Sequence, residues 1–226
     1  MLGLSKPVNK AKMGLSECSC PIYAPGPGRG KLDLIPSTLQ IVNVEMKRAE
    51  RKLNTFLETK VSGYDYVIID CPPTISLFTE AAILASGKYV VPIKPDPLSV
   101  VGLPLLERWL EDFIEDHGIK LKPVGLIFSL VRTPTPGAMR DVMEDLKSKR
   151  SGEIFGTSLT VSTDVVKSSG SREPIFLHKP RSKSAQQIKA ITEEFLKRDF
   201  QLDRVQLRHR NRALVPHQLC RLVQPL

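Results

Sequence analysis

The segment from Tyr64 to Pro73 constrains the fold more than any other part of the chain. It reads YDYVIIDCPP, so an apolar run ends at a carboxylate, Asp70, and two prolines follow. Such a run predicts a strand buried on both faces, and the prolines end it. In open α/β folds ligands bind at the carboxyl ends of parallel strands, where an aspartate can hold a Mg²⁺-bound water beside a nucleotide phosphate. Taken alone, the pattern more often marks a buried strand that ends in a capping aspartate.

Apolar periodicity predicts alternating strands and helices from Leu32 onward, which is typical of a parallel sheet covered by helices. The fold class that we predict is therefore α/β, with a doubly wound, mostly parallel sheet and helices on both faces. The expected strands are 32–36, one that ends at Asp70, 89–93, 124–131 and 154–159, and the expected helices are 44–61, 77–86, 98–117, 135–149, 163–169 and 183–197. In helix 98–117 the core face is predicted to hold Leu98, Val101, Leu105, Trp109, Leu110, Phe113 and Ile114.

Five blocks of sequence, taken in order, resemble the ParA/Soj/MinD family of partition ATPases. They read LDLIPS at 32–37, YDYVIIDCPPT at 64–74, YVVPIKPD at 89–96, LSVVGL at 98–103 and PVGLIF at 123–128. The resemblance runs from about Leu32 to Arg198, and the order of the blocks is more specific than any one of them. It implies a P-loop NTPase fold, ATP and Mg²⁺ as cofactors, and a role in chromosome or plasmid partitioning with a ParB-like partner.

The phosphate loop of that family, GKGGxGK[ST], has no match in the chain. The nearest segment is GPGRGK at 26–31, but Leu32 follows its lysine where Mg²⁺ binding needs Ser or Thr. The prolines at 25 and 27 also remove backbone donors. We therefore expect a shortened family member that is incomplete at the N-terminus, lacks the Walker A loop and has negligible ATPase activity alone. Whether it is an ATP hydrolase or binds no cofactor stays open.

The resemblance also implies roles for individual residues. Asp70 would be the Walker B carboxylate, catalytic and bound to Mg²⁺ through water. Pro73 and Thr74 would belong to the segment that senses the γ-phosphate. Ser129 aligns with a polar residue near the adenine, where MinD-like members often carry Asn. For Ser129 the favoured alternative is a buried hydroxyl bonded to the backbone.

The chain is strongly basic, with a formal net charge of +9, and most of this charge lies near its two ends. Basic surfaces bind nucleic-acid phosphates without reading sequence. The family resemblance implies such non-specific DNA binding from the C-terminal half. The alternative for each of these basic side chains is an ordinary surface charge without a binding role. The candidates are Arg132, Arg172, Lys179, Arg181 and Lys183.

We expect three regions along the chain: an irregular basic leader at 1–31, a ParA-like α/β domain at 32–198, and a basic tail at 199–226. No apolar run approaches the 18 residues of a membrane span. The expected location is cytoplasmic, and nucleoid-associated if the chain binds DNA. Three functions remain: a partition ATPase family member, a non-enzymatic module that forms homodimers or binds full-length relatives, and a non-functional remnant.

Overall fold

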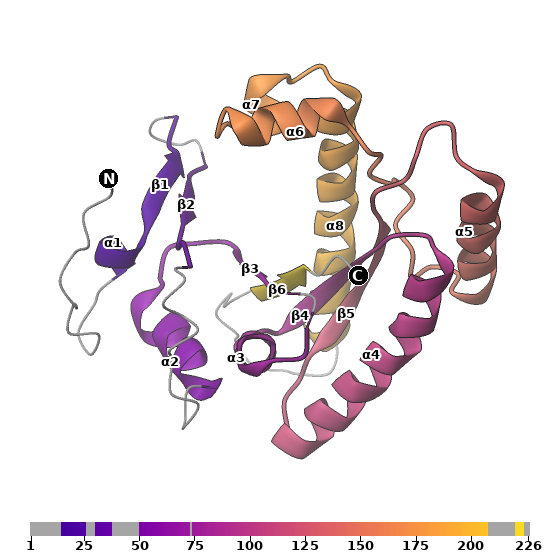
Figure 1. Cartoon of the computed structure of the whole chain (residues 1–226). Coiled ribbons are helices and arrows are strands. Elements are labelled where there is room, and N and C mark those ends of the chain that lie inside the picture. Colours follow the sequence, from indigo (N-terminus) through magenta and orange to yellow (C-terminus); the bar gives the residue numbers. More distant parts are fainter. Residues whose placement is uncertain (1–14, 26–29, 38–49, 73, 208–219, 224–226) are drawn as a thin grey trace.

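The computed structural model describes residues 15–25, 30–37, 50–72, 74–207 and 220–223 (Figure 1). Its elements in chain order are α1 (Leu15–Cys18), β1 (Cys20–Tyr23), β2 (Leu32–Leu34), α2 (Glu50–Lys60), β3 (Val67–Asp70), α3 (Leu77–Leu84), β4 (Lys88–Ile93), α4 (Pro97–His117), β5 (Lys122–Phe128), α5 (Gly137–Lys149), α6 (Thr163–Gly170), α7 (Ile175–His178), α8 (Lys183–Leu207) and β6 (Cys220–Val223). The regular alternation of strands and helices from β3 to α5 confirms the α/β fold class.

Parallel pairing organises the sheet. β4 pairs with β5, and β3 pairs with β6. β6 also lies beside β4, so the C-terminal strand is placed between β3 and β4 (Figure 1). Beyond β5 the chain returns at two parallel bridges, Leu126↔Ile154 and Val131↔Thr160.

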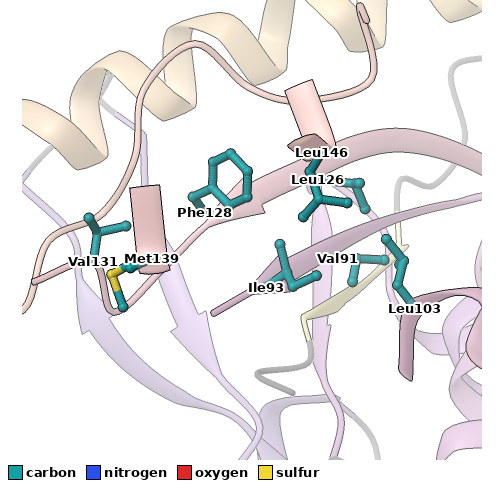
Figure 2. Packing of buried hydrophobic residues seen from close by; sticks show 8 residues of the cluster. All are labelled: Val91, Ile93, Leu103, Leu126, Phe128, Val131, Met139 and Leu146. Carbon is teal, nitrogen blue, oxygen red and sulfur yellow. The ribbon is translucent and has the colours of Figure 1, made fainter. Parts of the chain in front are cut away.

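Helices cover both faces of the β4–β5 pair. Successive side chains of a strand point to opposite faces, and here apolar side chains on each face pack against other elements. On one face Val91 and Ile93 pack with residues of α4 and α5, as Figure 2 shows. On the other face Val90 and Val124 pack against Phe155 and against Phe195 of α8. The prediction of helices on both faces is therefore confirmed.

α4 confirms the predicted helix but buries a different stripe of its surface. Asp96 caps its start, and Gly118 ends it in the left-handed conformation at φ 60°. The buried apolar residues are Leu103, Leu110 and Phe113. Leu110 and Phe113 were expected on the core face, whereas Leu103 was not. Leu98, Val101 and Leu105 are 85%, 66% and 65% exposed, so their assignment to the core face was wrong. The first half of α4 carries two apolar stripes, and periodicity alone does not decide which one meets the sheet.

Several expected boundaries also need correction. β5 ends at Phe128 instead of residue 131, because Leu130 takes a left-handed conformation with φ 53° and turns the chain. Residues 154–159 form bridges and single backbone hydrogen bonds to the β5 segment instead of a continuous strand. α5 begins at Gly137, since Pro136 is extended at ψ 150° and itself takes the N-cap position.

The two ends of the described chain differ most from the expected order of elements. β2 pairs antiparallel with β1 and does not join the parallel strands. α8 continues past the predicted end at residue 197 to Leu207, because no Gly or Pro interrupts residues 198–207. The expected domain boundary at 198 thus falls inside α8. Of the expected helix 44–61, residues 44–49 lie outside the described residues.

Candidate functional site

The carboxyl ends of β3, β4 and β5 form the edge where an α/β sheet binds ligands. Asp70 ends β3, Lys94 follows β4, and Ser129 follows β5. These three side chains supply a carboxylate, a cation and a hydroxyl from three different strands. The candidate site is built on this edge.

Asp70 is exposed at the end of β3, and Cys71 directly after it is buried. The next residues fold back in a tight turn: the amide of Thr74 donates to the carbonyl of Pro72 at 2.8 Å. The hydroxyl of Thr79 in α3 donates to the carbonyl of Thr74 at 2.6 Å. Thr74 is therefore held just before α3 with its own side chain exposed. Pro73, the other expected switch residue, lies outside the described residues.

Lys94 and Asp96 were not predicted as site residues, although the KPD sequence follows a buried strand. Their side chains form an ion pair of 3.0 Å. Asp96 also accepts a hydrogen bond of 2.9 Å from the amide of Ser99. This amide, and then Lys94, hold the pKa of the Asp96 carboxyl below its ordinary value. Asp96 therefore caps α4, and Lys94 places a positive charge at the edge of the sheet.

Ser129 sits where β5 ends. Its amide donates to the carbonyl of Ile93 at 2.9 Å, which ties the end of β5 to the end of β4. Its Oγ is buried and has no hydrogen-bond partner among the described residues. The favoured expectation, a hydroxyl bonded to the backbone, is therefore wrong. A buried hydroxyl without a partner is costly, so this one is available to a ligand or a water molecule.

Lys31, the lysine of the GPGRGK segment, is engaged elsewhere. Its Nζ donates to the hydroxyl of Tyr64 at 3.3 Å and lies 3.4 Å from a carboxylate oxygen of Asp33. The Tyr64 hydroxyl in turn donates to Asp33. The bond with Tyr64 raises the pKa of Lys31 and lowers the pKa of Asp33. Because Lys31 leads into β2 instead of a helix, it is not placed like the lysine of a phosphate loop.

These residues fit only half of a Mg²⁺–nucleotide site. Mg²⁺ is commonly held by one or two carboxylates together with substrate phosphates and water, and Asp70 offers such a carboxylate. No group of three His, Cys, Asp or Glu side chains is arranged for metal binding within the described residues. Of the GPGRGK segment, residues 26–29 lie outside the described ranges, and the described Lys31 leads into β2.

Four of the five basic candidates for DNA binding lie along one corner of the molecule, where α6, α7 and the start of α8 meet (Figure 1). Arg172 follows α6, Arg181 and Lys183 lie at the start of α8, and all three are exposed. Lys179 follows α7 and pairs with Asp164 at 2.9 Å, which offsets part of its charge. Arg132 is exposed but lies in the loop after β5. We call Arg172, Lys179, Arg181 and Lys183 the basic corner.

None of the helices within the described ranges is both long and apolar enough to cross a bilayer.

Comparison with known proteins gives a consistent set of relatives. A family model described as an AAA domain matches residues 25–122. The sporulation initiation inhibitor protein Soj of Bacillus subtilis (strain 168) is 28% identical over 160 residues, which cover 69% of this chain and 63% of Soj. A ParA family protein of Chlamydia muridarum is 27% identical over 178 residues, covering 75% and 69%. The chromosome partitioning protein ParA of Myxococcus xanthus is 24% identical over 173 residues, covering 74% and 61%. The chain thus matches less than two thirds of the length of Soj.

Proposed function

Because this chain belongs to the ParA/Soj family of P-loop ATPases, we propose that it serves chromosome or plasmid partitioning as a member that does not hydrolyse ATP by itself. One observation carries the proposal: Asp70 stands at the carboxyl edge of the sheet without a phosphate loop. The sequence contains no GKGGxGK[ST] segment. The lysine of the GPGRGK segment, Lys31, is bound to Tyr64 and Asp33.

Phosphoryl transfer depends almost entirely on positioning and on electrostatic stabilisation of the phosphates. Asp70 can contribute to Mg²⁺ binding, and Thr74 lies in the turn that follows it. Neither group neutralises the β- and γ-phosphates. Lys94 directly follows β4 at this edge of the sheet, but its ammonium group is paired with Asp96. We therefore expect weak or absent nucleotide binding and no turnover.

The partition role would rest on the basic corner. Arg172, Arg181 and Lys183 are exposed cations on neighbouring elements, an arrangement that suits the phosphate backbone of DNA. Phe176 lies between Arg172 and Lys179 in the sequence, but its ring packs edge-on against Tyr23, so stacking on single strands is not the favoured mode. In this proposal the chain associates with the nucleoid in the cytoplasm and works with a ParB-like partner.

Calorimetry with Mg²⁺-ATP tests the nucleotide half of the proposal. The purified chain is compared with the Asp70→Ala variant and with Asp65→Ala, a matched control. Asp65 is an exposed carboxylate at the opposite end of β3. We expect no binding that depends on Asp70. Mg²⁺-dependent ATP turnover that is lost in Asp70→Ala and kept in Asp65→Ala would refute the proposal and show that the chain is itself an ATPase.

A second function is favoured by the exposed stripe of α4. Leu98, Val101 and Leu105 present three large apolar side chains to solvent on one helix. Such a stripe suits a module that forms homodimers or binds a full-length family member through α4. Sedimentation of the chain alone tests self-association. A change from dimer to monomer in Leu105→Glu, without any change in Glu111→Ala farther along α4, would support the module.

A further inference from the structure

The βαβ unit made of β3, α3 and β4 leaves a position in the sheet one strand wide. Strands joined in this way usually lie next to each other. Here they do not pair: β3 pairs with β6, β4 pairs with β5, and β6 lies between them (Figure 1). The strand that fills the position comes from the far end of the sequence. We call this position the strand slot.

The register of β6 matches what the strand slot requires. Cys220 is aligned with Val67 and Leu222 with Ile69. These two β3 residues are half-buried and pack against the cluster of Leu57 and Ala85. Arg221 is aligned with Ile68, whose side chain is 61% exposed. In the sequence CRLV, the apolar residues 220 and 222 are thus in register with half-buried residues of β3, and the arginine is in register with an exposed one.

The hydrogen-bonded pairing of β6 is short and, among the described strands, involves β3 alone. β6 pairs with β3 over four residues, from Val67↔Cys220 to Asp70↔Val223. Within the described strands no ladder joins it to β4, whereas β4 pairs with β5 from Lys88 to Ile93. The β4–β5 pair is further joined by the cluster in Figure 2, which also includes residues of α4 and α5.

We infer that the strand slot is an acceptor site for an extended segment, and that residues 220–223 are its resident and reversibly docked occupant. The occupant enters parallel to β3 with apolar residues at alternate positions, as in other cases of strand addition to a sheet. In the folded chain the segment comes from the same molecule, because tethering keeps it at an effective concentration on the order of millimolar.

The strand slot lies next to Asp70 of the candidate site. Val223 is aligned with Asp70, so the occupant ends beside the carboxylate of the Walker B position. Whatever segment fills the slot therefore determines which backbone lies next to Asp70. The inference does not depend on the proposed loss of ATP hydrolysis, because it concerns the pairing of β3 alone.

Disulfide trapping in the full chain tests the inference. The variant Val67→Cys pairs with the native Cys220, and neighbouring strands lie about 4.8 Å apart, within the range a disulfide can bridge. The other cysteines are replaced (Cys18→Ser, Cys20→Ser, Cys71→Ala). Mild oxidation is expected to link residues 67 and 220 within one molecule, with a yield that is unchanged on tenfold dilution. Val67→Cys with Cys220→Ser and Ile68→Cys with native Cys220 are the matched controls.

Two substitutions in β6 then show whether the disulfide yield depends on docking in the strand slot or on chance collisions of the two cysteines. Leu222→Asp places a charge in register with the half-buried Ile69 and is expected to lower the yield at least tenfold, while Arg221→Gln leaves it unchanged. Hydrogen exchange of Leu222→Asp should be faster at residues 67–70 and unaltered at 88–93. Equal yields in both variants, links mainly between two molecules, or global unfolding of Leu222→Asp would each overturn the inference.

Discussion

Lys88 at the start of β4 and Asp199 in α8 form a buried ion pair, with Nζ 2.8 Å from Oδ1 and only 8% and 5% of the side chains exposed. The Tyr66 hydroxyl also donates to Asp199, at 3.4 Å. The preceding residue, Arg198, donates to the carbonyls of Val124, Gly152, Glu153 and Ile154. Two consecutive residues of α8 thus fasten the helix to the sheet.

Removing one member of the pair should be strongly destabilising. In Asp199→Ala the Lys88 ammonium stays buried without its carboxylate, and we expect a loss of about 3–5 kcal/mol in the free energy of unfolding. Replacing both residues, as in Lys88→Met with Asp199→Leu, should recover most of this loss. Urea unfolding followed by circular dichroism measures both. Glu193→Ala, which removes an exposed pair with Lys189 on the same helix, serves as control and should change little. Equal losses in the single and double variants would contradict the explanation.

Gly125 offers a test of the close packing between β5 and the returning chain. It has φ +145°, and a Cβ placed there would lie 2.3 Å from the carbonyl oxygen of Glu153. We expect Gly125→Ala to destabilise the chain by at least about 3 kcal/mol, through strain and loss of the bridge between Leu126 and Ile154.

Gly118 is the matched control for this substitution. It has φ +60° but nothing within 4 Å of an added Cβ. Gly118→Ala should therefore cost only the left-handed conformation itself, about 1–2 kcal/mol. Thermal unfolding of the two variants compares the costs, and a Gly125→Ala variant as stable as Gly118→Ala would exclude the predicted clash.

The sequence predicts the elements well where one residue type decides the local structure. The strand end at Asp70, set by the following prolines, and the helix end at residue 117, set by Gly118, are both confirmed. The prediction fails where two faces of one helix are equally apolar, as in the first half of α4. It also fails where a backbone conformation such as that of Leu130 ends a strand. Asp70 could be placed at a strand end from sequence. The unpartnered hydroxyl of Ser129 could not, because it depends on the packing around it.

The placement of β6 lies beyond any local pattern. Its pairing with β3 joins residues from distant parts of the chain. The four residues CRLV carry little strand signal alone, and only an unfilled position between β3 and β4 makes them a strand. The sequence pattern therefore does not indicate which segment lies between β3 and β4.

Tyr89 should make the stability of the chain depend on pH in the alkaline range. Burial, and then the charges of Glu107, Glu111 and Glu153, raise its pKa from 10.0 to about 12. The folded chain therefore favours the protonated phenol more than the unfolded chain does. Its contribution is fully present below pH 10 and is lost as the pH rises to about 12, a loss of roughly 2–3 kcal/mol.

The Tyr89→Phe variant isolates this effect, because other groups that titrate above pH 10 are the same in both proteins. The difference in unfolding free energy between wild type and variant should shift in favour of the variant between pH 10 and 12. Urea unfolding at a series of pH values measures it. A difference that stays constant across this range would show that Tyr89 does not titrate abnormally.

The basic corner leads to a prediction about salt. Each phosphate contact adds about 0.9 to the slope of log affinity against log salt concentration for duplex DNA. If Arg181 and Lys183 each contact a phosphate, the double variant Arg181→Gln with Lys183→Gln should lower that slope by about 2, by the same relation. The loss should be equal for unrelated DNA sequences, because phosphate contacts carry no sequence information.

Fluorescence anisotropy with a labelled duplex, at several salt concentrations, measures the slope. Lys120→Gln is the matched control, because Lys120 is an exposed cation just before the amino end of β5. This places it at the edge of the sheet away from the candidate site. A slope that falls equally in Lys120→Gln would indicate a general effect of net charge. Binding that does not weaken with salt in the wild type would exclude phosphate contacts altogether, and with them the role proposed for the basic corner.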